Sequence, residues 1–120
     1  MRFTGYAAVF DAVDRGGDVI RRGAFAEARA PVLLWQHRGS AVGAIEALAE
    51  DARGLKVTGS IEDARLGALV AAGAVAGLSV GYRVVAQRQG AWRELLTLEL
   101  IEVSLVAQPM QRLARVTQVF

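Results

Sequence analysis

The chain of 120 residues contains no cysteine and a single histidine, His37. The absence of cysteine excludes a disulfide scaffold, a zinc ribbon, an iron–sulfur cluster and a thiol nucleophile. A single histidine excludes a multi-histidine metal site and a pair of catalytic histidines within one chain. If the protein carries out acid–base chemistry near neutral pH, His37 is therefore the first candidate. We expect neither a metal nor a cofactor.

The chain also lacks an excess of either charge. Fourteen basic residues stand against twelve acidic ones, which gives a formal net charge of +2. The arginines are scattered, and only Arg21 and Arg22 are adjacent, so no basic tract of the kind that binds nucleic acid is present. We therefore expect no nucleic-acid partner.

Strongly apolar runs are scarce as well. The N-terminus alternates polar and apolar residues, so we expect no signal peptide. Leu66–Tyr82 is an uncharged stretch of 17 residues with glycines at a spacing known from helix pairs in membranes. A spanning helix needs about 20 predominantly apolar residues, whereas this stretch is short and rich in glycine and alanine. We predict a helix, a turn and a strand within a soluble core, and no membrane association.

Hydrophobic alternation predicts a chain dominated by strands. Strands are expected over Arg2–Phe10, Asp18–Arg21, Val32–Gln36, Val42–Ala49, Leu55–Ser60, Leu78–Val85 and Trp92–Val106. Helices are expected over Ile61–Ala72 and within Gly23–Ala30, whereas Gln111–Phe120 fits either a helix or a strand. No linker or repeat divides residues 1–120, so we expect a single domain. The predicted fold is a β-rich α+β domain, a partly closed antiparallel barrel of six or seven strands with two or three flanking helices.

Ser79 lies within Gly77-Leu78-Ser79-Val80-Gly81, which matches the G-x-S-x-G pattern of hydrolase nucleophiles. In those enzymes a strand precedes the serine and a helix follows it, whereas here the helix is expected first. No histidine follows Ser79 either, so a hydrolase elbow is excluded. What remains is a small hydroxyl between glycines that allow close backbone approach, which suits a peptide substrate or an oxyanion pocket. The alternative is a serine used because nothing larger fits.

Two further side chains are candidates for joining Ser79. His37 ends an apolar strand and precedes a polar loop that opens space beside the ring, although a histidine bonded to backbone at a strand end is the alternative. Glu102 shares a strand face with mostly apolar residues and Ser104, and such a carboxylate needs a partner, either a histidine N–H or an arginine. Lower-ranked carboxylates are Asp51, Glu46 and Asp11. From the residues alone, Ser–His–acid catalysis is one hypothesis among several.

Six stretches, in the expected order, resemble the prohead (capsid maturation) proteases of tailed phages. They are the opening strand Phe3–Phe10, the I-x-x-G-A-F segment Asp18–Phe25, the histidine strand Pro31–His37, the hairpin made of Val42–Ile45 and Glu50–Val57, the nucleophile strand Gly73–Tyr82, and the closing E-x-S-L-V-x-x-P motif Glu102–Pro109. The family consists of serine peptidases whose fold resembles that of the herpesvirus assembly proteases. The resemblance therefore implies a herpesvirus protease-like fold and one prohead protease domain over residues 1–120.

The same resemblance assigns roles to three residues. His37 is implied as the general base, Ser79 as the nucleophile, and Glu102 as the group that orients the imidazole and stabilises its charged form. The herpesvirus enzymes use a second histidine as the third member. Because this chain has no second histidine, its third member must be a carboxylate, with Asp51 as the alternative to Glu102.

The resemblance also implies the partners and the place of action. The implied substrate is the N-terminal region of the major capsid protein, bound as an extended strand at a sheet edge. Scaffold or portal proteins and a second copy in a homodimer are further partners. The enzyme would act without a cofactor in the host cytoplasm, within or associated with the procapsid of a phage-like or gene transfer agent-like particle.

The sequence departs from the family pattern in two places. Arg38 follows His37 where an acidic or amide residue is common, and Met110-Gln111 follow Pro109 where Ala-Asn is usual. Neither departure removes an implied catalytic group. An inactive, protease-like assembly or scaffolding module that binds capsid protein is the alternative function.

Overall fold

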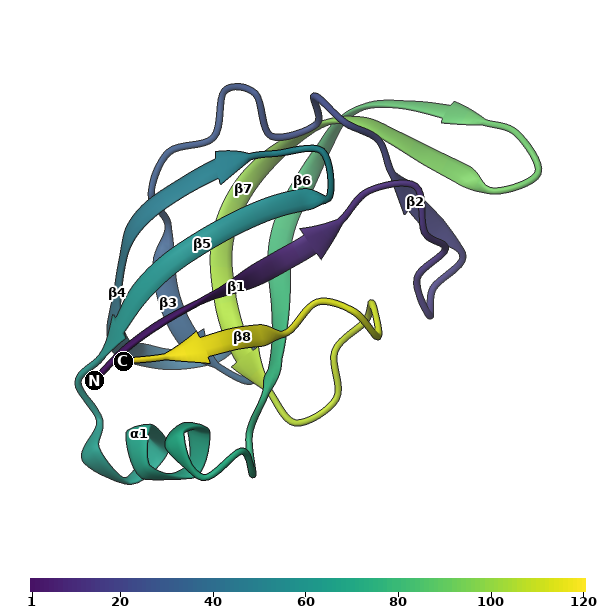
Figure 1. The fold of residues 1–120 in the computed structure, drawn as a ribbon. Helices are drawn as coiled ribbons and strands as arrows, with labels where there is room; N and C mark the ends of the chain where they lie inside the picture. Colours follow the sequence, from purple (N-terminus) through teal and green to yellow (C-terminus); the bar gives the residue numbers. More distant parts are fainter.

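The computed structural model describes residues 1–120 and contains eight strands and one α-helix (Figure 1). In chain order these are β1 Arg2–Val9, β2 Asp18–Ile20, β3 Val32–Trp35, β4 Arg38–Glu50, β5 Gly54–Ile61, α1 Ala64–Ala71, β6 Gly77–Gln89, β7 Arg93–Val106 and β8 Val116–Val119. The two ends of the chain lie side by side, because Arg2 N donates a hydrogen bond to Phe120 O at 3.1 Å. The predicted strands are present, and the ambiguous tail forms the strand β8.

Strand β7 is the centre of the sheet. Along one edge it pairs with β6 in antiparallel fashion, and along the other it pairs in parallel with β2 near its start and β3 near its end. From β3 the sheet continues through β4, β5 and β1 to β8. The expected all-antiparallel arrangement is therefore wrong at two pairs. The chain passes from β5 through α1 before it enters the β6–β7 hairpin. As a result β7 lies beside β3 and runs in the same direction. Hydrophobic alternation in the sequence does not reveal which strands become neighbours.

The hydrogen-bonded ladder is not closed into a barrel. Strand β6 pairs with β7 alone, so most of its other edge is open. At its base an isolated bridge joins Gly77 to Arg115, and Leu78 N donates a hydrogen bond to Ala114 O at 2.9 Å. These contacts link β6 to the segment before β8 and leave the edge of β6 free from Ser79 onward.

Only one of the expected helices forms. Helix α1 begins after Asp63, whose carboxylate accepts a hydrogen bond from Leu66 N at 2.9 Å and so caps the first turn. No helix in the structure has the length and apolar character needed to cross a membrane. The uncharged stretch Leu66–Tyr82 contributes to α1 and to the start of β6, so the helix, turn and strand predicted there are present.

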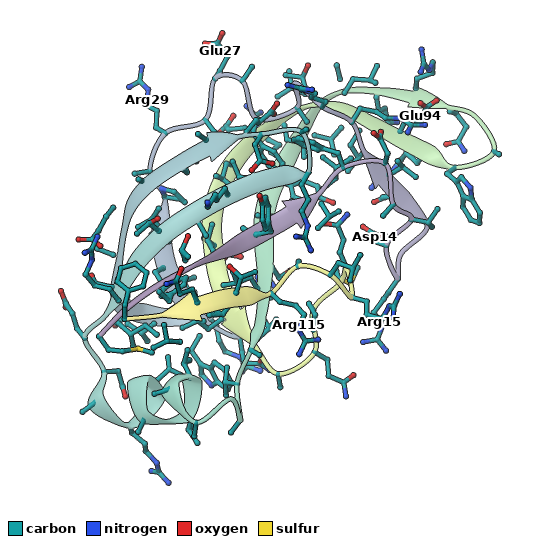
Figure 2. The ribbon with its side chains drawn as sticks, in the orientation of Figure 1. Asp14, Arg15, Glu27, Arg29, Glu94 and Arg115 are labelled. Carbon is teal, nitrogen blue, oxygen red and sulfur yellow. The ribbon has the colours of Figure 1, made fainter.

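The helix expected within Gly23–Ala30 is wrong, and the segment consists of turns. Gly23 has a φ of +94°, and the Glu50 carboxylate accepts hydrogen bonds from Gly23 N and Phe25 N, each at 2.8 Å. A segment this short is not a stable helix by itself, so these tertiary bonds decide its shape. The charged side chains that follow, Glu27 and Arg29, point away from the sheet (Figure 2).

The packing of β6 and β7 decides which side chains face the site. Leu78, Val103 and Leu105 are completely buried in the hydrophobic core. Successive side chains of a strand point to opposite faces. The residues adjacent to these three in β6 and β7 therefore point away from that core. These residues are Ser79, Glu102 and Ser104, and all three are nevertheless buried.

Candidate active site

His37 lies in a two-residue turn between β3 and β4. Trp35 pairs with Arg38 across this turn, and the two residues between them, Gln36 and His37, have φ angles of 53° and 64°. Positive φ at both positions defines a type I′ hairpin turn, which normally carries asparagine or glycine. A residue with a Cβ loses roughly 1–2 kcal/mol of stability when its backbone adopts this left-handed conformation. The polar loop expected after His37 is instead the start of β4, and the strained turn carries the imidazole.

Three hydrogen bonds fasten this turn to the end of β7. Gln36 N donates to Leu105 O at 3.0 Å, and Ala107 N donates to Gln36 Oε1 at 2.8 Å. His37 N donates to Ser104 Oγ at 3.0 Å. These bonds offset the backbone strain, and they make the position of the imidazole depend on β7.

The imidazole of His37 is paired with a buried carboxylate. Glu102 Oε1 accepts a hydrogen bond from His37 Nδ1, and Ser104 Oγ donates to Glu102 Oε2 at 2.6 Å. Glu102 is 7% exposed and Ser104 is 0% exposed, whereas 42% of the His37 side chain is exposed. Because Glu102 occupies Nδ1, Nε2 is the ring nitrogen left for another partner. This is the imidazole–carboxylate geometry of Ser–His–acid sites.

Glycine on β6 makes room for this carboxylate. Gly81 lies opposite Glu102, and a Cβ at Gly81 would come within 2.2 Å of Glu102 Oε1. A Cβ at Gly77 would come within 2.7 Å of Val106 O. Both glycines of the G-x-S-x-G pattern are thus required by close packing against β7 and not by an elbow turn.

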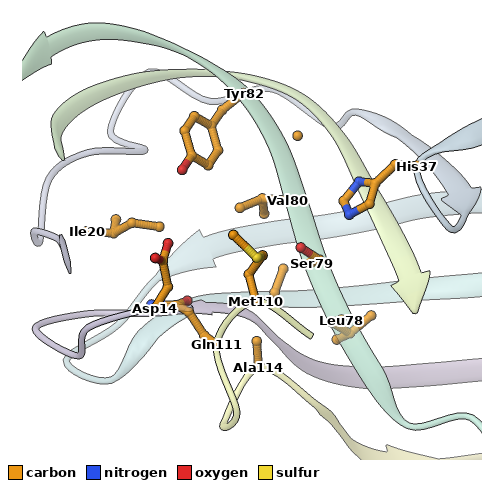
Figure 3. Close-up of a pocket in the computed structure, with 12 residues that line it drawn as sticks. Asp14, Ile20, His37, Leu78, Ser79, Val80, Tyr82, Met110, Gln111 and Ala114 are labelled. Atoms are coloured by element: carbon orange, nitrogen blue, oxygen red, sulfur yellow. The ribbon is translucent and has the colours of Figure 1, made fainter. Parts of the chain in front are cut away.

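Ser79 lies on the same face as these groups. It is opposite Ser104 in the β6–β7 pairing and is 5% exposed. It lines a cavity of about 270 Å³ together with His37 (Figure 3). No hydrogen bond joins Ser79 to His37, and such bonds are often long in enzymes without bound substrate. The structure therefore brings Ser79, His37 and Glu102 together at one site, while their catalytic roles stay predictions.

The other candidate carboxylates lie elsewhere. Asp51 closes the turn between β4 and β5, where it accepts a hydrogen bond from the Tyr6 hydroxyl that lowers the pKa of Asp51. Glu46 and Asp11 form ion pairs with arginines. None of the three contacts His37, so the alternative of Asp51 as the third member has no support in the geometry. No group of three histidine, aspartate or glutamate side chains is arranged to hold a metal ion.

Two side chains that hold the site together were not predicted. Ser104 could have been predicted from the sequence, because it lies two residues after Glu102 and so shares a strand face with it. Gln111 is 7% exposed; its Nε2 donates to Val9 O at 2.7 Å and its Oε1 accepts from Val9 N at 2.8 Å. Gln111 thus holds one wall of the cavity against β1. Its sequence position alone gives no sign of this pairing.

Comparisons with known proteins agree with this fold. The chain is 40% identical over 94 residues to the prohead protease of Enterobacteria phage HK97; the match covers 68% of this chain and 42% of that protein, so the chain spans less than half of this relative. Its fold resembles that of KSHV protease in complex with a hexapeptide phosphonate inhibitor, with a TM-score of 0.67 over 97% of this chain and 63% of the other. At 14% identity this likeness confirms the predicted herpesvirus protease-like fold. The sequence model described as Caudovirus prohead serine protease matches residues 1–119. The chain therefore belongs to the caudovirus prohead serine protease family.

Proposed function

We propose that this chain is a serine endopeptidase of capsid maturation, with residues 1–120 acting as one protease domain. The observation that supports this best is the contact of His37 with the buried Glu102, beside Ser79 in a shared cavity. Membership of a family of prohead serine proteases supports the same activity. The bridge between Gly77 and Arg115 supports a partly closed arrangement of the sheet within this domain.

The proposed reaction is acyl transfer without a cofactor. His37 Nε2 takes the Ser79 proton as Ser79 Oγ attacks the peptide carbonyl, and then gives the proton to the leaving amine. Glu102 orients the ring through Nδ1 and stabilises the imidazolium. Ser104 positions the carboxylate through its hydrogen bond to Oε2. Water then hydrolyses the acyl-enzyme and regenerates the Ser79 hydroxyl.

The proposed substrate is the N-terminal region of the major capsid protein, with scaffold and portal proteins as further partners. The open edge of β6 beside Ser79 supports binding of an extended peptide as an added strand. The proposed place of action is the host cytoplasm, within or associated with the procapsid, and a second copy in a homodimer is a further proposed partner.

Labelling with a serine-reactive phosphonate separates this protease from an inactive module that binds capsid protein. We expect mass spectrometry to find the label on Ser79 in the wild-type chain and in Ser40→Ala, a change of an exposed serine on β4. Ser79→Ala should take up no label, and His37→Ala should react far more slowly because the base is missing. A wild-type chain that binds capsid protein without labelling would favour the inactive module.

A further inference from the structure

A carboxylate with no part in this mechanism lines the same cavity as Ser79. Asp14 lies on the loop between β1 and β2, across the cavity from β6. Figure 3 shows its carboxylate pointing between Ile20 and Val80. A substrate strand added to the open edge of β6 would lie between that edge and Asp14, so its side chains would meet this carboxylate.

Local hydrogen bonds hold the Asp14 side chain in place. Its Oδ1 accepts from Gly16 N at 2.8 Å and from Asp18 N at 3.0 Å. Its Oδ2 takes part in no hydrogen bond or ion pair within the chain. The turn therefore uses one carboxylate oxygen and leaves the other for a ligand.

The end of the cavity near Asp14 carries a net negative charge. The neighbouring Asp18 is paired with Arg93 through two hydrogen bonds of 2.7 Å. Two carboxylates against one guanidinium leave one negative charge without a partner. Tyr82, which lines the same end, responds to this field: burial first, and then the charges of Asp18 and Asp14, raise the pKa of Tyr82.

Apolar side chains line the cavity between Ser79 and Asp14. They are Ile20, Val80 and Met110. Lysine and arginine bury their aliphatic stems along apolar surface while their charged ends reach a polar partner. An acidic side chain in this cavity would instead face a like charge, and a neutral one would leave Asp14 unpaired.

We propose that Asp14 selects substrates with a lysine or arginine side chain next to the scissile bond. This inference rests on the proposed protease function of the site, and it assigns Asp14 a role in specificity and none in the bond-breaking steps.

The test is the cleavage profile of the chain on a proteome-derived peptide library, read on both sides of the cut bond by mass spectrometry. The wild-type profile should show enrichment of lysine and arginine at one position adjoining the bond. Asp14→Asn keeps an Oδ1 acceptor for the turn and removes the charge. This variant should lose the enrichment, and its kcat/KM for a lysine peptide relative to the norleucine analogue should fall about tenfold or more. Glu27→Gln, an exposed carboxylate outside the cavity, is the matched control and should match the wild type.

The outcomes separate this inference from the protease proposal. A wild-type profile without basic preference, or a preference that survives in folded Asp14→Asn, would overturn the inference alone. Because the wild-type profile needs no variant, the test holds even if Asp14→Asn folds poorly, which circular dichroism would report. Absence of both peptide cleavage and phosphonate labelling of Ser79 would overturn the protease function, and the inference with it.

Discussion

The base and the tip of the β6–β7 hairpin are parts of one strand pair with opposite properties. At the base, Ser79, Gly81, Glu102 and Ser104 are packed closely, and the one carboxylate is buried and hydrogen-bonded twice. The tip projects away from the rest of the sheet (Figure 1), and its side chains are largely exposed, as Trp92 is at 52%. The proposed chemistry, which depends on exact distances, thus lies where backbone and side chains are both constrained.

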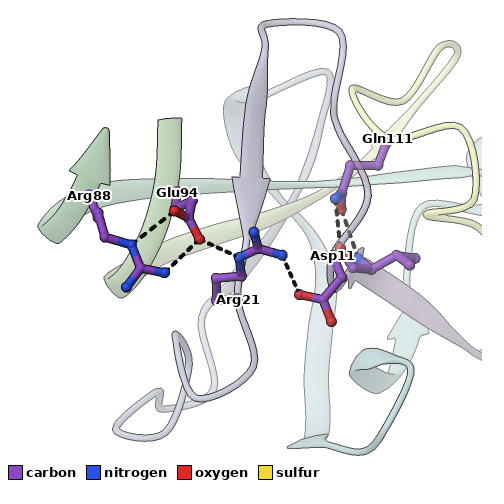
Figure 4. Close-up of polar contacts among 6 residues, drawn as sticks. Asp11, Arg21, Arg88, Glu94 and Gln111 are labelled. Atoms are coloured by element: carbon purple, nitrogen blue, oxygen red, sulfur yellow. Dashed lines mark hydrogen bonds and ion pairs between the residues drawn. The ribbon is translucent and has the colours of Figure 1, made fainter. Parts of the chain in front are cut away.

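Ion pairs, together with the parallel pairing of β2 with Arg93–Leu95, hold the tip to the rest of the molecule. Glu94 Oε1 accepts hydrogen bonds from Arg21 and Arg88, each at 2.8 Å, and Arg21 continues the chain of contacts to Asp11 (Figure 4). Exposed ion pairs contribute little to stability individually. The same kind of substitution should therefore reduce activity or stability much more at the base than at the tip.

The largest contrast is expected between two carboxylates of β7, Glu102 at the base and Glu94 at the tip. Glu102→Gln removes the negative charge beside His37 and favours the wrong imidazole tautomer. The corresponding change in a Ser–His–Asp protease lowers kcat on the order of 10⁴-fold, and we expect a loss approaching that size in kcat/KM for capsid-protein cleavage. Glu94→Gln at the tip should retain nearly full activity. Near-normal cleavage by Glu102→Gln would show that Glu102 is not the third member.

Two glycines, Gly81 in β6 and Gly90 in the turn that follows it, provide the second contrast. Gly81→Ala places a Cβ 2.2 Å from Glu102 Oε1, so the carboxylate must move away from His37. A displacement of about 1 Å at a catalytic group can cost about 10²-fold, and we expect a loss of that size. A Cβ at Gly90 would meet the flexible end of Glu94 at 3.3 Å and Trp92 O at an ordinary contact distance of 3.7 Å, so Gly90→Ala should leave cleavage unchanged. Equal activity of the two variants would contradict the proposal that the Glu102 carboxylate needs the space over Gly81 to reach His37.

Removal of the Ser104 hydroxyl should have a smaller effect on activity and a measurable one on stability. Ser104→Ala leaves Glu102 Oε2 and His37 N without their partner, which costs about 1–3 kcal/mol for buried groups. We expect a drop in the free energy of unfolding of that size in urea, and about tenfold lower kcat/KM because the imidazole is held less well. Ser40→Ala is the exposed control. Unchanged stability and an unchanged rate in Ser104→Ala would show that Ser104 does not position Glu102 and His37.

The smallest effect is the acid response of the tip. Hydrogen bonds from Arg88 and then Arg21 lower the pKa of Glu94 from 4.5 to about 2. A depressed carboxyl pKa stabilises the folded form above pH 4.5, and this contribution is lost as the pH falls from 4.5 through about 2. An NMR titration of the Glu94 carboxyl should have its midpoint near the lower value and shift upward in Arg88→Gln. A midpoint at the ordinary value in the wild type would show that the ion pairs do not form.

Local pattern predicted most of the strands and the helix because those signals are carried by neighbouring residues. Asp63 marks the start of α1, and alternation marks β5 and β7. The turns of Gly23–Ala30 were missed because Glu50, distant in sequence, supplies the bonds that shape them. The parallel pairing of β3 with β7 was missed for a related reason, since it depends on the path of the whole chain.

In the candidate site, too, local features could be predicted from the sequence, whereas features set by distant residues could not. Strand alternation placed Glu102 and Ser104 on one face, and the family resemblance selected His37 and Ser79. The positive φ of His37 could not be predicted, because the bonds that offset its strain come from the end of β7. The carboxylate of Asp14 was missed as well, because the cavity joins its loop to β6 only in the folded chain.

The most direct test of Ser79 as the nucleophile is incubation of intact major capsid protein with the wild-type chain and with Ser79→Ala. The wild type is expected to remove the N-terminal region of the capsid protein. Ser79→Ala should leave the capsid protein uncut while unfolding at the same temperature as the wild type. Full processing by folded Ser79→Ala would contradict the proposed mechanism.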